Sequence, residues 1–231
     1  MWQALRAEHH AQGFEVVTVA LDVEIEAARP AVMEAKAEHP SLIDRAHVVD
    51  ELFGMVNVPN GVWIDDDGMI VRPAEPAWPG PSPIVDSLKN MDVSTLPPEQ
   101  AEILLEARKI KSDPEGYRDM LLDWIEHGAE SRYALSPDEV IRRSNPRSDD
   151  EARAAAHFEL GEHLHRAGDH AAAIPHWREA HRLFPTNWTY KRQAWDLEDP
   201  MRQGRTEHYD GSWFDDVKVL GAENYYPPLV P

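Results

Sequence analysis

The chain contains no cysteine among its 231 residues. This absence excludes disulfide bonds, thiolate-bound zinc, iron–sulfur clusters and every mechanism that uses a cysteine nucleophile within the chain. The sequence also contains no Gly-x-Ser-x-Gly element, phosphate-binding loop or dinucleotide-binding glycine pattern. Serine hydrolysis and nucleotide chemistry therefore have no support. We assign no catalytic residue to this chain and expect no bound cofactor.

Positive charge is scarce. The 23 Lys and Arg residues face 42 Asp and Glu residues, which gives a formal net charge of -19. Such a charge repels a phosphate backbone and an anionic lipid surface, so we expect neither nucleic acid nor a membrane as a partner. No apolar run approaches the ~20 residues that cross a bilayer, and the first residues lack a secretory-signal pattern. We expect a cytoplasmic protein.

The first part of the chain alternates helix and strand patterns. A Val-rich apolar run at 14–21 is typical of a strand covered on both faces, and Asp65-Asp66-Asp67-Gly68 is a hairpin signal. The expected elements are helices at 2–12, 24–38 and 46–53, strands at 14–21 and 41–43, and a hairpin with strands at 62–64 and 69–71. We expect Pro30 to start or kink the second helix. This order predicts an α/β layer.

Proline is concentrated between residues 73 and 98 and leaves room for one short helix, around 84–91. We interpret 73–98 as a linker or wrapping segment that overlaps the end of a first domain, 1–92. The second domain, 99–231, is expected to be helical and to end in an aromatic, proline-bearing tail that packs back on the helices. Its expected helices lie at 99–110, 114–127, 137–143, 150–167, 170–183 and 188–197.

Residues 154–187 follow one period of a helical repeat. The pattern consists of Leu160-Gly161, Leu164, Ala173, Trp177, Ala180 and Pro185. It resembles the tetratricopeptide repeat, in which small residues lie where two antiparallel helices cross and large ones fill the groove between them. One repeat is not stable alone, so we expect the helices at 114–127 and 188–197 to cap it.

The segments 14–22 (FEVVTVALD), 51–59 (ELFGMVNVP) and 61–71 (GVWIDDDGMIV) carry a second resemblance. In order and spacing they are similar to the thioredoxin-like fold, closest to its thiol-reductase and peroxiredoxin-like branch, over roughly residues 2–92. The resemblance implies a cis Val58–Pro59 peptide bond that presents the preceding backbone to an extended peptide.

The chain departs from this family at the active site. The family's Cys-x-x-Cys follows the central strand and begins the first helix, but here that helix begins at or before Trp2. The strand and dithiol would lie upstream of Met1. Three explanations remain: an N-terminally shortened chain, which we favour, a strand supplied by a partner, or closure of the remaining strands. A missing central strand leaves unpaired backbone groups on both of its neighbours.

Two segments are candidates for peptide binding. The first is the turn Val58-Pro59-Asn60, and the second is the polar, aromatic stretch 187–195, which is unusual in an acidic chain. The candidate peptide-binding residues are Val58, Pro59, Asn60, Trp188, Tyr190, Lys191 and Arg192. For 187–195, the competing interpretation is a capping helix whose tryptophans pack on the repeat, and we favour it over a groove.

Six histidines crowd residues 157–181, but they show no His-Glu-x-x-His spacing. We interpret them as helix surface and expect no metal site. The sequence thus predicts an incomplete thioredoxin-like α/β domain followed by an all-α domain with one repeat. Its predicted function is non-catalytic binding of a protein or peptide partner. The alternative is a shortened thiol–disulfide or peroxide oxidoreductase whose catalytic cysteines lie upstream of Met1. Nothing in the sequence specifies an oligomeric state.

Overall fold

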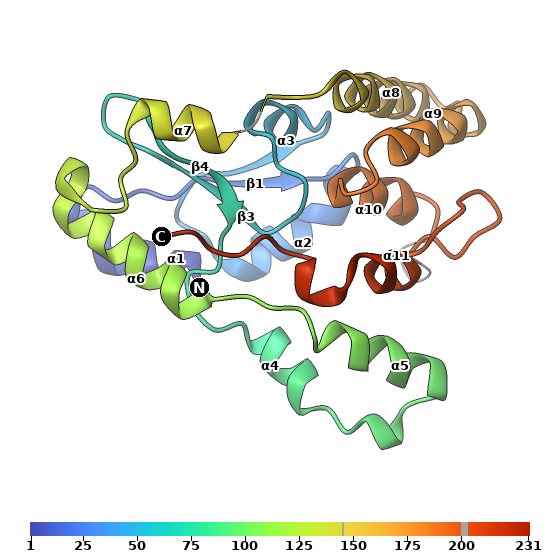
Figure 1. The fold of residues 1–231 in the computed structure, drawn as a ribbon, viewed down its shortest axis with the longest axis horizontal. Helices are drawn as coiled ribbons and strands as arrows, with labels where there is room; N and C mark the ends of the chain where they lie inside the picture. Colours follow the sequence, from blue (N-terminus) through green and yellow to red (C-terminus); the bar gives the residue numbers. More distant parts are fainter. Residues whose placement is uncertain (145, 200–202) are drawn as a thin grey trace.

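The computed structural model describes residues 1–144, 146–199 and 203–231. Within these ranges the chain is mixed α/β, with two small sheets followed by a largely helical part (Figure 1). This confirms the predicted combination of an α/β part and a helical part. No helix in the described ranges combines the length and the apolar character that crossing a bilayer requires.

The first sheet is a parallel pair. Its two strands run from Thr18 opposite Ser41 to Leu21 opposite Asp44. The elements in this part are α1 (Trp2–His9), β1 (Thr18–Leu21), α2 (Ile25–Ala35), β2 (Ser41–Asp44) and α3 (Val48–Phe53). Pro30 lies inside α2 and neither starts nor ends it. The helix tolerates it because the carbonyl left without a helical bond belongs to Glu26, which is exposed to water.

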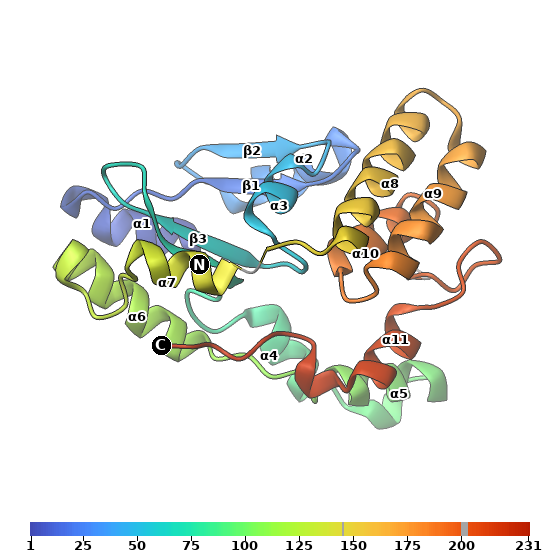
Figure 2. The same ribbon diagram turned by 45° about the horizontal axis from the view of Figure 1, so that its top comes forward.

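The second sheet is the expected hairpin of β3 (Asn60–Ile64) and β4 (Ile70–Pro76). Its turn is closed by the Asp65 carboxylate, which accepts hydrogen bonds from the Asp67 and Met69 amides at 3.1 and 2.8 Å. The Val58–Pro59 peptide bond before β3 is cis, as expected. In the described residues the two sheets share no ladder, and β1 lies between β2 and the hairpin in Figure 2.

Helices form most of the remaining chain, and their ends follow the proline and glycine signals. They are α4 (Pro83–Asn90), α5 (Pro98–Ala107), α6 (Pro114–His127), α7 (Pro137–Ser144), α8 (Asp149–Arg166), α9 (His170–Leu183), α10 (Trp188–Asp196) and α11 (Trp213–Leu220). We did not expect α11. Its start is marked by Ser212, whose hydroxyl accepts a hydrogen bond from the Asp215 amide at 3.2 Å.

Helices α8 and α9 form an antiparallel hairpin over the predicted repeat. A Cβ atom at Gly161 would lie 2.5 Å from the Trp177 indole nitrogen, so the helices cross there only because the residue is glycine. Trp177 and Ala173 are fully buried between the helices. Gly161, Ala173 and Trp177 therefore lie where the two helices pack, whereas Leu160, which belongs to the same pattern, is exposed.

Two apolar clusters hold the chain together. One surrounds the α8–α9 hairpin and includes Trp188 and Trp195 of α10. The other joins Leu5 and Trp63 to Tyr117 of α6. Helix α10 packs on α9 as expected, but the expectation that 114–127 caps the repeat was wrong, because α6 packs on the α/β part instead.

Candidate functional site

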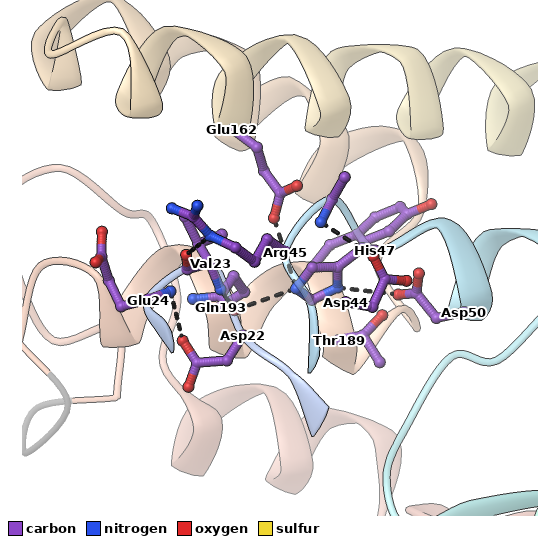
Figure 3. A network of polar contacts seen from close by, with 12 residues as sticks. Asp22, Val23, Glu24, Asp44, Arg45, His47, Asp50, Glu162, Thr189 and Gln193 are labelled. Carbon is purple, nitrogen blue, oxygen red and sulfur yellow. Dashed lines mark hydrogen bonds and ion pairs between the residues drawn. The ribbon is translucent and has the colours of Figure 1, made fainter. Parts of the chain in front are cut away.

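A buried polar network lies where the α/β part meets the repeat hairpin (Figure 3). At its centre is His47, whose Nδ1 lies 3.2 Å from Asp50 Oδ2 and whose Nε2 lies 3.1 Å from Gln193 Oε1. The Glu162 carboxyl lies 3.5 Å from the same Nε2. The exposed fractions of His47, Asp50 and Glu162 are 3%, 1% and 0%. The network therefore joins α3, α8 and α10 out of contact with water.

Local backbone structure holds His47 in place. The residue adopts a left-handed conformation with φ 52° directly before α3, which is unusual for a residue with a side chain. The Asp44 carboxylate at the end of β2 fixes this loop, because it accepts hydrogen bonds from the Ala46 and Val49 amides at 3.1 and 2.7 Å. Asp50, which contacts the His47 ring, lies in the first turn of α3.

The network favours a charged imidazole. Burial alone lowers the pKa of His47, but the Asp50 hydrogen bond and the charges of Glu162 and Asp50 outweigh burial, and the net pKa is raised. The Gln193 oxygen also accepts a hydrogen bond from the Val23 amide at 3.3 Å, so it acts as an acceptor for His47. Burial raises the pKa of Glu162 to about 7, although the positive charges of His47 and Arg166 oppose that shift.

This arrangement resembles an acid–base set, but its surroundings do not suit catalysis. Both ring nitrogens of His47 already face protein oxygens, and the ring is closed off from solvent. A general base needs a position within reach of a substrate proton, and His47 has none. Within the described ranges, moreover, no set of three or more His, Cys, Asp or Glu could hold a metal ion. The network positions the repeat hairpin against the α/β part. We did not predict it, because its members come from positions as far apart as 47 and 193.

The structure brings the two predicted peptide-binding segments together. The Trp188 amide, at the start of α10, donates a hydrogen bond to the Val56 carbonyl at 2.6 Å, just before the Val58-Pro59-Asn60 turn. The α10 side chains do not line an open groove, however. Trp188, Tyr190 and Lys191 are buried, and Arg192 is half-buried. Trp188 and Trp195 instead pack in the apolar cluster of the repeat hairpin, as the capping interpretation expected.

The end of the chain contacts the turn, although Val58 itself stays exposed. We call residues 225–231 the tail. The Tyr226 hydroxyl donates to the Val58 carbonyl at 2.9 Å, and the Asn57 side-chain amide donates to the Tyr225 carbonyl at 3.2 Å. Further along, Arg72 and Arg143 donate to the Val230 carbonyl at 2.6 and 3.0 Å. Figure 1 shows the tail crossing the molecule from α11 towards α6.

A cavity of about 500 Å³ lies beside the tail. Its walls include Trp78, Lys111, Asp113, Tyr226 and Pro228. The Trp78 and Tyr226 rings meet edge to face, with centroids 5.6 Å apart. The surface under the tail, which we call the tail face, thus combines the Trp78 ring with side chains that donate hydrogen bonds to backbone carbonyls of the tail.

Comparison with known proteins found no similarity. No family model matches the chain, and neither a curated protein nor a solved structure matches it. Its function must therefore be argued from its own residues.

Proposed function

We propose that this chain is a non-catalytic thioredoxin-like and repeat protein that binds an extended, proline-bearing segment of a partner protein at the tail face. One observation carries the proposal: the chain's own tail, Tyr-Tyr-Pro-Pro-Leu-Val-Pro, already occupies that face, and after a bend at its two tyrosines it forms neither helix nor strand. The tail is the model for the ligand that a partner would supply.

The contacts to the tail are of the kind that recognise an extended peptide. Three of them bind backbone carbonyls, namely those of Tyr225 and Val230. Such contacts do not depend on the ligand's side chains, so they hold many sequences in one register. Proline-rich segments also lose little conformational entropy on binding, because they are extended before they bind.

Side-chain selectivity would come from the aromatic contacts. Tyr226 packs against Trp78 and hydrogen bonds to the Val58 carbonyl. Leu229 packs against the apolar cluster around Leu5 and Trp63. A partner segment with an aromatic residue and an aliphatic residue flanking two prolines would make the same contacts. The cavity beside the tail leaves room for a longer segment.

Two features support the proposed thioredoxin-like and tetratricopeptide-type assignments. The order β1, α2, β2, α3 and then the β3–β4 hairpin is the order implied by the thioredoxin-like resemblance. The packing of Gly161 against Trp177 is what a tetratricopeptide-type hairpin requires. Both assignments remain part of the proposal.

The test uses the full chain and a fluorescent peptide with the tail sequence, followed by fluorescence anisotropy. The chain's own tail competes with the added peptide, so a substitution that weakens the contacts of the tail gives tighter binding of the peptide. Tyr226→Phe removes the hydrogen bond to Val58, which is worth about 1 kcal/mol, so we expect about fivefold tighter binding of the unmodified peptide. The control is Tyr209→Phe, since Tyr209 also loses a bond to a carbonyl, that of Ala194, but outside the tail face.

Peptide binding that is absent from all three proteins, or equal in Tyr226→Phe and Tyr209→Phe, would refute the proposed site. A circular dichroism spectrum of each variant verifies that it is folded.

A second candidate function has one observation in its favour. Among the residues that the structure describes, strand β1 is paired only with β2 and β3 only with β4, and all four residues of β1 are half-exposed. Parallel strands are normally covered on both faces and flanked by neighbours. A strand that enters beside β1 would complete a sheet, and in a longer form of this protein it would carry the dithiol of an oxidoreductase. Translating the coding sequence upstream of the Met1 codon tests this: a strand pattern followed by Cys-x-x-Cys supports it, and an in-frame stop refutes it.

A further inference from the structure

Two pairs of histidines bridge α8 and α9. His157 Nδ1 lies 3.0 Å from His176 Nδ1, and His165 Nδ1 lies 2.9 Å from His170 Nδ1. In each pair one residue comes from each helix of the repeat hairpin, so the antiparallel packing of the two helices sets both distances. At these distances two neutral rings can form a hydrogen bond, and two rings can also bind one metal ion together.

The distances suit two nitrogens bound to one metal ion. Metal–imidazole bonds are about 2.0–2.1 Å, so two cis ligands at a right angle place their nitrogens about 2.9 Å apart. A tetrahedral angle would place the nitrogens about 3.4 Å apart. The observed separations match the right angle, which is the preference of tetragonal Cu²⁺ and Ni²⁺ and not of tetrahedral Zn²⁺.

The surroundings also suit a cation. All four rings are only half-buried, so water can complete the coordination shell. This is needed because the described residues hold no group of three or more protein ligands. Glu24 lies 3.6 Å from His165 Nε2, on the far side of that ring from the pair. The net charge of -19 attracts cations to the whole surface.

We propose that each histidine pair chelates one divalent copper or nickel ion, which gives two sites per chain on the repeat hairpin. An ion held in this way links α8 to α9 and stabilises the hairpin, because it binds only where the two helices are packed.

Isothermal titration of the full chain with NiCl₂ at pH 7.5 tests the proposal. We expect two ions per chain, one ion for His157→Gln and none for the double variant His157→Gln/His170→Gln. His163→Gln is the matched control, since His163 is exposed on α8 and outside both pairs, and it keeps two ions. In the copper form, electron paramagnetic resonance should show nitrogen coupling that the double variant lacks.

No binding by the unmodified chain, or an unchanged stoichiometry in the double variant, would overturn the assignment. Circular dichroism of each variant separates loss of ligands from loss of fold.

Discussion

Replacing Glu162 by glutamine tests the electrostatics of the buried network. This side chain is fully buried, 3.5 Å from His47 Nε2 and 3.4 Å from a guanidinium nitrogen of Arg166. Its pKa rises from 4.5 to about 7. A shift of that size corresponds to about 3 kcal/mol between the two protonation states.

The direction of the pH dependence of stability follows from whether the folded or the unfolded state binds the proton more tightly. Folding raises the pKa of Glu162, so its contribution to stability is present below pH 4.5 and is lost as the pH rises through 7. Folding also raises the pKa of His47, and that contribution is lost as the pH rises above 6.5. The free energy of unfolding therefore falls between pH 5 and pH 7.5 in the unmodified chain.

Urea unfolding at pH 5 and pH 7.5 measures this fall. In Glu162→Gln the side chain no longer titrates, so we expect the fall between these two pH values to be smaller by about 2 kcal/mol than in the unmodified chain. The matched control is Glu159→Gln, an exposed position on the same helix, which should keep the slope of the unmodified chain. An equal pH dependence in Glu162→Gln and the unmodified chain would refute the assigned electrostatics.

Three further substitutions test the packing of the fold by the same unfolding assay. Gly161→Ala places a Cβ atom 2.5 Å from the Trp177 ring, so the free energy of unfolding should fall by about 1–3 kcal/mol. An unchanged stability would show that α8 and α9 cross less closely. Ser148→Ala removes the N-cap of α8 and should cost about 1 kcal/mol, unless that end of the helix is not formed. The Trp63 indole N–H donates to the Tyr117 hydroxyl at 2.9 Å, and Tyr117→Phe removes this acceptor. The free energy of unfolding should fall by about 1–3 kcal/mol. An unchanged stability would mean that water reaches this core.

Much of the secondary structure could be predicted because its signals are local. Gly13 and Gly54 end the helices before them in left-handed conformations, and Pro114 starts α6. The strand expected from residue 14 begins only at Thr18, where its amide reaches the Pro40 carbonyl and the ladder with β2 starts. The apolar run specified a strand, but only a partner strand could define its bounds.

Packing between distant segments was harder to predict. The apolar face of α6 could pack on either a repeat or a sheet. In the structure it packs on Leu5 and Trp63, which belong to the α/β part. The polar network depends on a His47–Gln193 contact between residues that no local pattern relates. The signal that could have suggested it is the pair of polar residues Asp44 and His47 at a strand end.

The turn at Val58 and the start of α10, which the sequence named as separate candidates, lie side by side in the structure. Peptide binding by either segment stays a prediction. The sequence also suggested that the aromatic tail packs back on the protein, but it did not indicate that the tail contacts this turn. Tyr226 reaches Val58 from a position 168 residues away in the sequence, and such contacts have no local signature.

We propose that the tail occupies a peptide-binding face and that a peptide can replace it there. The most direct measurement is ¹⁹F nuclear magnetic resonance of the full chain with fluorotyrosine in place of Tyr226, during titration with unlabelled tail peptide. We expect the signal to move from the chemical shift of a ring packed on Trp78 to that of a solvent-exposed ring as the peptide saturates. A signal that stays at the packed position at saturating peptide would contradict it.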